Sequence, residues 1–201
     1  MVVSNVSKLL RELGVKKRGH DLVTNFCGWR PLMEYANRSM RAGWIAAACF
    51  TTGGRISEVL NYNPKQFAYD YLPTGEEIIR CDALEVLKKR ASASLIKRRR
   101  TLMVPAKERM VPILMDAVEY AQDHKQDTLF NFTNRSHAWR IVTEVDPLWW
   151  PHRFRTERAS QLVSEKGFDV ALLMKFFNWD KAEEAVGYVR LNPEDMVKKM
   201  F

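Results

Sequence analysis

Apolar residues recur at helical spacing along most of the chain. Between positions 31 and 50 they follow one face of a helix, for which Pro31 is a natural first residue, and Gly53-Gly54 ends the pattern. Residues 55–60 predict a short second helix that ends ahead of Pro64, because proline disfavours helical geometry in the residue before it. After Pro112 the helical pattern returns in segments separated by polar breaks: 113–123, 136–145, 152–165, 169–177, 181–190 and 193–200.

Polar residues mark the expected starts of the last helices. Asp169, Asp180 and Asn192 stand where N-caps belong, since their side chains accept hydrogen bonds from the unpaired N–H groups of a first turn. Pro193 would occupy the first turn of the final helix.

The segment between the two helical regions has the composition of strands. It is rich in Ile, Val, Leu and Tyr at 66–71, 77–89 and 100–105, and Pro73-Thr-Gly75 interrupts it. The expected fold class is therefore α+β, mainly helical, with a small three-stranded antiparallel sheet. Residues 1–28 are predicted to be a loosely packed polar extension, and residues 29–201 to form one domain, because 201 residues with 46% hydrophobic side chains suffice for one substantial core.

The positive charge of the chain is concentrated in one stretch. The formal net charge is +8 and the pI about 9.5, which suits a partner rich in phosphate, although a generic basic protein fits this balance equally well. Residues 88–109 contain a single acid, Glu108, and alone account for the net charge. The candidate phosphate-binding residues of this stretch are Lys88, Arg90, Lys97, Arg98, Arg99 and Arg100.

Several classes of site and location are disfavoured. Cys27, Cys49 and Cys81 have no Cys-x-x-Cys spacing, so the sequence supports neither a disulfide framework nor a zinc site. Clustered carboxylates that could hold paired magnesium ions are also missing, and we expect no metal and no cofactor. No segment approaches the roughly 20 apolar residues of a membrane span, so we expect a cytoplasmic protein associated with DNA.

Five residues could carry chemistry, although each has an ordinary explanation when taken alone. Arg55 follows two glycines at the start of a short helix, a place suited to an anion, but it could simply pair with Glu58. His152 and Arg155 share one helix face, which could equally be solvated. The remaining two, Trp179 and Tyr188, would ordinarily be assigned to the core or the surface.

Together and in this order, these residues resemble the catalytic domain of the tyrosine recombinases. Members of that family carry an arginine in a Thr-Gly-x-Arg-x-x-Glu turn, a lysine in a β-hairpin, a His-x-x-Arg, and a His or Trp placed nine residues before a nucleophilic tyrosine. Residues 52–58 (Thr-Gly-Gly-Arg-Ile-Ser-Glu), the basic hairpin, 152–155 and the Trp179/Tyr188 pair match these motifs in sequence order. The resemblance covers about residues 30 to 195.

The resemblance implies a role for each residue. Arg55 and Arg155 would hold the phosphate, His152 would accept the tyrosyl proton, Trp179 would donate its indole N–H, and Tyr188 would attack. The hairpin lysine would protonate the leaving oxygen. Family register favours Lys89 for that role, with Lys88 and Lys97 as alternatives.

The chain departs from the family pattern at three points. Asn178 stands where the family often has Gly, and Thr156 where it often has His, so we expect altered packing rather than lost activity. Many relatives also carry a DNA-clamping domain ahead of the catalytic one, whereas only about 30 residues precede the first predicted helix. DNA affinity would then come from the catalytic domain, a partner or oligomerisation. Residues 193–201 are a candidate for a segment exchanged between subunits of a tetramer, and a tail packed on its own chain fits them equally well.

The sequence thus predicts a site-specific recombinase or integrase that cuts and rejoins double-stranded DNA through a 3′-phosphotyrosyl intermediate. One alternative is a non-catalytic DNA-binding accessory protein with the same fold. Another is a DNA-relaxing enzyme like the type IB topoisomerases, which share the first chemical step.

If the stretch 88–109 contacts several phosphates, DNA binding must weaken steeply with salt. Each neutralised phosphate adds about 0.9 to the slope of log affinity against log salt concentration. Titrating a labelled duplex at increasing NaCl measures that slope, and an affinity insensitive to salt would refute this role.

Overall fold

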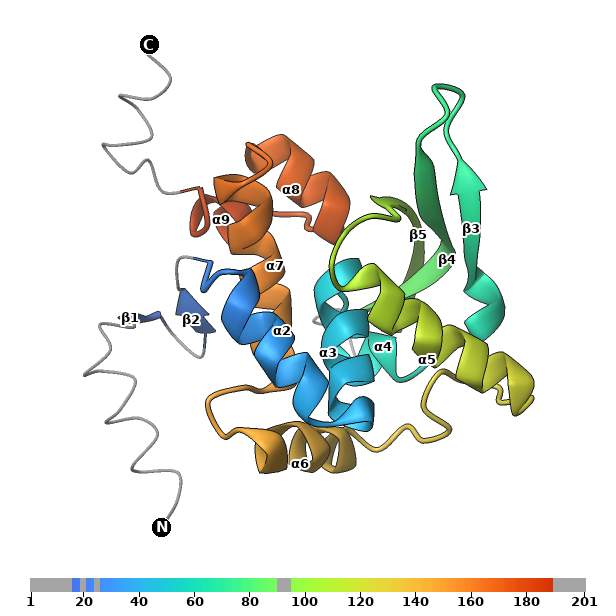
Figure 1. Cartoon of the computed structure of the whole chain (residues 1–201). Coiled ribbons are helices and arrows are strands. Elements are labelled where there is room, and N and C mark those ends of the chain that lie inside the picture. Colours follow the sequence, from blue (N-terminus) through green and yellow to red (C-terminus); the bar gives the residue numbers. More distant parts are fainter. Residues whose placement is uncertain (1–15, 19–20, 24–25, 90–94, 190–201) are drawn as a thin grey trace.

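A computed structural model of the chain describes residues 16–18, 21–23, 26–89 and 95–189 (Figure 1). It is mainly helical, with one three-stranded antiparallel sheet, and so confirms the predicted fold class. The elements, in chain order, are β1 (Lys16–Arg18), β2 (Asp21–Val23), α2 (Trp29–Arg38), α3 (Met40–Thr52), α4 (Ile56–Val59), the 3₁₀ turn η1 (Pro64–Gln66), β3 (Phe67–Tyr71), β4 (Glu77–Lys89), β5 (Leu95–Pro105), α5 (Val111–Asp123), α6 (Arg135–Val145), α7 (Pro151–Ser164), α8 (Val170–Phe177) and α9 (Ala182–Val186).

Helix α3 is the centre of the main core. It contacts α2, α5, α6 and α7, and Figure 1 shows it enclosed by these helices. Because it is covered on all sides, its residues from Ala42 to Thr52 are buried, and the small side chains of 46–49 let the neighbouring helices approach. A second hydrophobic cluster joins α7, α8 and α9 through Leu162, Leu173 and Ala185.

The single helix expected over 31–50 is two helices, so that prediction was wrong. Ser39 adopts extended geometry between α2 and α3, and its Oγ accepts a hydrogen bond from the Ala42 N–H at 3.4 Å. Apolar spacing does not reveal this break, because both helices face the same core. The first of them also begins at Trp29, two residues ahead of Pro31.

The sheet has the order β3–β4–β5, with Phe67 opposite Cys81 and Ile79 opposite Val104. β3 and β4 match their predicted positions closely. β5 begins at Leu95, five residues earlier than expected, because main-chain hydrogen bonds form the ladder even where the side chains are cationic.

Helices α5 to α8 occupy their predicted places, apart from details at their ends, whereas the helix expected over 181–190 is limited to α9, Ala182–Val186. Asp169 caps α8 as predicted, its Oδ1 accepting from the Leu172 N–H at 2.8 Å. The predicted cap Asp180 was wrong, since Lys181 is the N-cap of α9. That helix ends at Val186, so Tyr188 lies just beyond it, in a turn closed by its N–H and the Ala185 carbonyl.

Parts of the predictions fall outside the described residues. These are Arg90, Asn192, the helix expected over 193–200 and most of the extension over 1–28. Phe26 and Cys27, at the end of that extension, pack against the main core.

The cysteines are free in the structure. Burial, reinforced by the nearby Glu157 carboxylate, raises the pKa of the Cys27 thiol to about 12. Burial also raises the pKa of Cys81 to about 12, and that of Cys49. In the part of the chain that the structure describes, no helix is long and apolar enough to cross a membrane.

Gly53 ends α3 at a place where no other residue fits. Its φ is +61°, and a Cβ built on it would lie 2.3 Å from Cε1 of Phe177, at the end of α8. Gly167 has a φ of +67°, with nothing within 4 Å of the same added atom. Comparing Gly53 with Gly167 therefore separates the cost of left-handed backbone geometry, which both share, from the cost of steric contact, which only Gly53 has.

Gly53→Ala is expected to destabilise the protein more than Gly167→Ala. Left-handed geometry should cost each alanine variant about 1–2 kcal/mol. Overpacking against Phe177 should add about 1–3 kcal/mol to Gly53→Ala alone. Urea unfolding of both variants measures the difference, and equal losses would contradict a tight contact between Gly53 and α8.

Candidate active site

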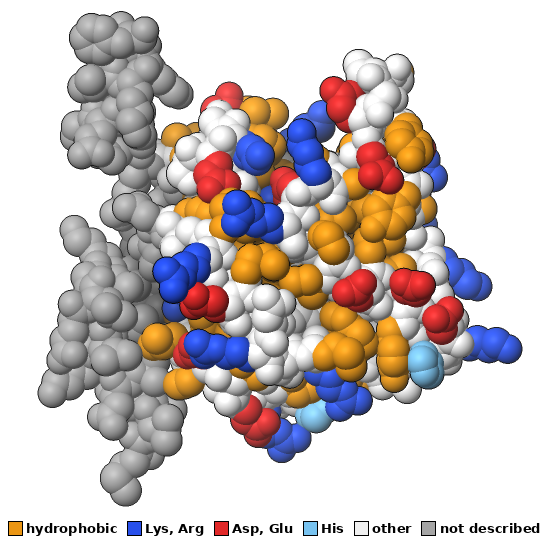
Figure 2. All heavy atoms as spheres, viewed as in Figure 1, with side chains coloured by type: hydrophobic (Ala, Val, Ile, Leu, Met, Phe, Trp, Pro, Cys, Tyr) orange, Lys and Arg blue, Asp and Glu red, His pale blue; other side chains and the backbone are white. Residues whose placement is uncertain are grey.

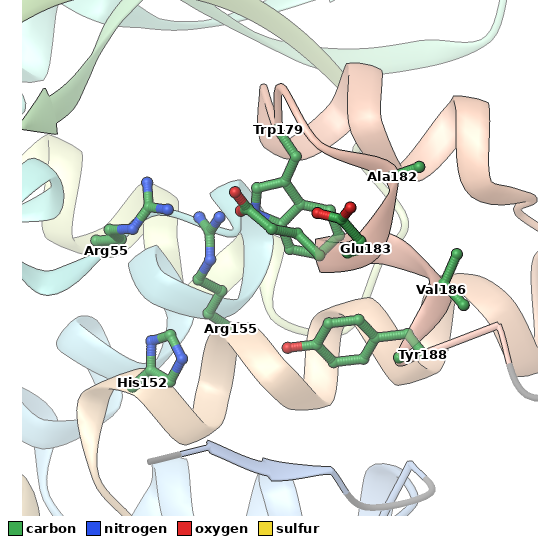
Figure 3. A pocket seen from close by; sticks show the side chains of 10 residues that line it. Arg55, His152, Arg155, Trp179, Ala182, Glu183, Val186 and Tyr188 are labelled. Carbon is green, nitrogen blue, oxygen red and sulfur yellow. The ribbon is translucent and has the colours of Figure 1, made fainter. Parts of the chain in front are cut away.

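A pocket of about 530 Å³ lies where the start of α4, the first turn of α7 and the α8–α9 region meet (Figure 3). All five residues selected from the sequence outside the basic hairpin line it: Arg55, His152, Arg155, Trp179 and Tyr188. These positions span most of the chain, so the fold brings together what the sequence keeps apart.

Arg55 is fixed by its own helix. It is the N-cap residue of α4, and its backbone N–H donates to Oε2 of Glu58 at 2.8 Å. Its Nη1 lies 3.2 Å from the other carboxylate oxygen, and the Glu58 side chain is fully buried. The ordinary interpretation of Arg55, an ion pair with Glu58, is therefore correct, and that pair holds the guanidinium at the pocket.

Arg155 is a buried cation. Only 2% of its surface is exposed, and its Nη1 donates to the Gly53 carbonyl, just ahead of Arg55. Its Nη2 is buried and has no hydrogen-bond partner among the described residues. Burial, followed by the positive charge of Arg55, lowers the pKa of Arg155 to about 10, so it is still protonated at neutral pH. A buried charge with an unsatisfied N–H favours an anionic ligand.

Three aromatic rings form a stack beside this cation. Phe177 and Trp179 stack with centroids 4.5 Å apart, and Trp179 and Tyr188 with centroids 5.5 Å apart. The Arg155 guanidinium lies 4.7 Å from the Phe177 centroid and 5.5 Å from that of Trp179. In Figure 3 the Tyr188 hydroxyl points toward His152 and Arg155. Trp179 is thus both a buried residue and a pocket residue.

The two departures from the family motifs have local explanations. Asn178 ends α8 in the left-handed conformation, with φ 52°, which asparagine tolerates better than most residues. Thr156 is buried, and its hydroxyl donates to the His152 carbonyl at 3.2 Å.

The basic hairpin is described mainly through its backbone. Lys88 and Lys89 end β4 opposite Ile96 and Leu95, and Lys97 pairs with Leu87. Arg98 pairs with Val86, and Arg99 is exposed on β5. Among the described residues, the pocket lining includes none from β4 or β5.

Arg100 differs from the other cations of the hairpin. The sequence predicts it as a DNA-binding residue, but it is only 8% exposed and its guanidinium donates hydrogen bonds to main-chain carbonyls. Strand alternation explains this, because Arg100 shares the inward face of β5 with Leu102 and Val104. We therefore assign it no contact with DNA. The one acid of the basic stretch, Glu108, is also buried, and pairs with Arg158 at 2.6 Å.

The sequence did not single out the part of the lining that comes from α9 and its C-cap. Those residues are Ala182, Glu183, Glu184 and Val186 of the helix and the C-cap Gly187. Their place in the sequence, just before Tyr188, was the feature from which they could have been predicted as pocket residues. Nowhere in the described part of the chain do three or more His, Cys, Asp or Glu residues form a group able to hold a metal ion.

The face of the molecule in Figure 2 carries both signs of charge. Lys and Arg side chains alternate there with Asp and Glu, and hydrophobic side chains lie between them. The net positive charge of the chain is therefore not gathered on this face.

Comparison with known proteins identifies the fold. No family model and no curated protein matches the chain. It is similar to XerH site-specific recombinase bound to difH substrate in a pre-cleavage complex, with TM-score 0.54 and 15% identity over 88% of this chain and 53% of that one. XerA recombinase matches with TM-score 0.52 and 15% identity, over 85% and 60%. Tn1549 transposon integrase with transposon right-end DNA matches with TM-score 0.55 and 12% identity, over 92% and 67%.

These matches establish a fold rather than an activity. The chain has the fold of a tyrosine recombinase catalytic domain, as the motif resemblance predicted. It spans about half the length of the XerH recombinase that it matches.

Inorganic phosphate is expected to stabilise the protein through this pocket. At ten times its dissociation constant, phosphate contributes about 1.4 kcal/mol and should raise the melting temperature by about 3–6 °C over NaCl of equal ionic strength. Arg155→Lys should reduce this increment, because one ammonium cannot serve both the Gly53 carbonyl and the ligand. The exposed Arg140→Lys is the matched control. An equal increment in all three proteins would mean that phosphate acts only as a general stabilising salt.

Proposed function

We propose that the protein is a DNA strand transferase in which Tyr188 attacks a phosphodiester of double-stranded DNA. The observation that carries this proposal is the pocket, where residues of three of the four sequence motifs meet: the Arg55 turn, the His152–Arg155 pair and the Trp179/Tyr188 pair. The likeness in fold to recombinases and an integrase bound to DNA supports it.

Arg55 and Arg155 would hold the non-bridging oxygens of the phosphate. Negative charge increases on these oxygens as the tyrosyl oxygen attacks, and planar guanidiniums suit them better than ammonium groups do. Donors fixed in advance contribute roughly 3–4 kcal/mol each in comparable sites. Arg155 is already desolvated, and its unpartnered Nη2 would gain a hydrogen bond when phosphate binds.

Tyr188 needs help to act as a nucleophile, because a phenol with a pKa of about 10 is mostly protonated at neutral pH. His152 lies on the side toward which the hydroxyl points, and would accept its proton (Figure 3). Trp179 would support the tyrosyl ring by stacking and would donate its indole N–H to a phosphate oxygen.

The reaction would form a bond between the tyrosyl oxygen and phosphorus and break the bond to the 5′ oxygen. A lysine of the basic hairpin would protonate that leaving oxygen, and Lys89 remains the first candidate ahead of Lys88 and Lys97. The products would be a 3′-phosphotyrosyl bond and a free 5′ hydroxyl. Because the phosphodiester energy is retained in the covalent bond, rejoining would need no external energy source.

DNA would be held by cations of the hairpin, among them Lys88, Arg90, Lys97, Arg98 and Arg99. A complete recombination requires cuts in more than one strand, so the protein would act as an oligomer on DNA. Integration or site-specific recombination is the role that these properties favour.

The test is a covalent complex with DNA. A pool of nicked suicide duplexes with a randomised central segment serves as the probe, because the target sequence is unknown. Wild type should give a protein–DNA band that survives denaturation, Tyr188→Phe should give none, and the exposed Tyr120→Phe should behave like wild type.

Two other outcomes would change the assignment. Tight DNA binding by wild type without a covalent band would favour the accessory DNA-binding protein. Relaxation of supercoiled plasmid without recombinant products would favour the topoisomerase-like activity.

A further inference from the structure

Arg100 lies buried at the junction of three elements on whose relative positions the pocket depends. It comes from β5, and its Nη2 donates to the carbonyl of Thr52, the last residue of α3, at 2.7 Å. Its Nη1 donates to the carbonyl of Phe176, in the last turn of α8. One guanidinium thus joins the sheet to the ends of two helices.

Both carbonyls lie at helix C-termini. The last carbonyls of a helix have no partner within the helix and carry partial negative charge, so a cation is favoured there. A guanidinium offers several N–H groups in a fixed plane and reaches two carbonyls at once, whereas an ammonium is a point charge on a flexible stem.

We call the two hydrogen bonds of Arg100, to Thr52 and to Phe176, the Arg100 clamp. Its bond to the Thr52 carbonyl holds the turn that leads to Arg55. The Thr52 hydroxyl donates to Ala48 at 2.6 Å and accepts from the Gly54 N–H at 3.0 Å, which shapes the turn into α4. The next carbonyl, that of Gly53, is bound by Arg155. Two buried guanidiniums from different elements therefore hold consecutive carbonyls of the turn that presents Arg55.

The bond from Arg100 to the Phe176 carbonyl holds the end of α8, next to the stack of Phe177, Trp179 and Tyr188. Phe177 follows Phe176 directly, lies against Gly53, and stacks on Trp179, which in turn stacks on Tyr188. Any movement of the end of α8 would therefore move Tyr188 relative to Arg55. Arg100 does not line the pocket, so it can act only through these neighbours.

We propose that Arg100 is a positioning residue that fixes the Arg55 turn and the Trp179–Tyr188 stack relative to each other and to the basic hairpin. The effect of Arg100 on DNA cleavage rests on the proposed function. Its hydrogen bonds to Thr52 and Phe176 do not depend on that function. Cleavage requires the phosphate held by the arginines to lie in line with the tyrosyl oxygen. Misplacement by about 1 Å costs on the order of 100-fold in rate.

The test compares Arg100→Lys with Arg80→Lys. Arg80 lies on the same sheet and also joins two partners, with its Nη1 2.7 Å from Asp70 and its Nε 2.7 Å from Asp82, but it does not contact α3 or α8 through these bonds. Both changes keep the charge of the chain, so differences between them report geometry. Arg100→Gln, which keeps an amide NH2 group as donor without the charge, provides a second variant if the lysine variant folds poorly.

Hydrogen exchange of the DNA-free protein tests the clamp without assuming any activity. In Arg100→Lys, amides of 52–55 and 177–188 should exchange roughly tenfold faster, the factor that corresponds to losing about one hydrogen bond to a charged group. Amides of α2 should be unchanged, and Arg80→Lys should match wild type. Unchanged exchange in both segments overturns the clamp.

The effect on cleavage is tested by single-turnover kinetics. The substrate is a suicide duplex whose sequence is recovered from the covalent complex. Arg100→Lys should lower the rate of covalent complex formation by roughly 100-fold, with the DNA dissociation constant within about threefold of wild type. A wild-type cleavage rate despite faster exchange would overturn the positioning role. If wild-type protein forms no covalent complex, the proposed function fails, and hydrogen exchange still decides whether the clamp exists.

Discussion

The pocket depends on the turn between α3 and α4, where two buried guanidiniums bind neighbouring main-chain carbonyls. Arg155 binds the carbonyl of Gly53, and Arg100 that of Thr52. The turn is held on one side by α7 and on the other by β5, and Phe177 closes it from α8. Side chains from these elements converge on Thr52 and Gly53, the residues that lead to Arg55, so the geometry of the site follows from how this short segment is held.

The two arginines of the pocket differ in how their positive charge is compensated, and this difference favours an anionic ligand. Glu58 neutralises Arg55 in part, whereas Arg155 is buried against aromatic faces and a carbonyl, and its pKa is lowered as a result. Carbonyl dipoles and ring faces stabilise a buried cation less completely than a carboxylate does. The positive charge of Arg155 is therefore only partly compensated, and a bound phosphate would supply the missing negative charge. Arg158 shows the contrast, because it is buried with Glu108 as an ion-pair partner and lines no part of this pocket.

The elements and the pocket residues were predictable because they rest on local patterns and on ordered motifs. Helical spacing located α5 to α8, and the resemblance to the tyrosine recombinases selected five residues that line one pocket. The errors arose where packing overrides pattern. Ser39 divides a continuous apolar stripe into two helices, and the cations of 95–99 concealed the start of β5.

The sequence by itself determined the types and order of the elements from α4 to α8 and the residues brought to the pocket, because these depend on periodicity and on local chemistry. Only the tertiary structure decided that Arg100 faces inward, that Asn178 takes the left-handed place of a glycine, and that Tyr188 follows α9 in a turn and stacks on Trp179. Each of these depends on groups distant in the chain. The partners of Arg100, for example, stand at positions 52 and 176, and only folding brings those carbonyls within reach of one guanidinium.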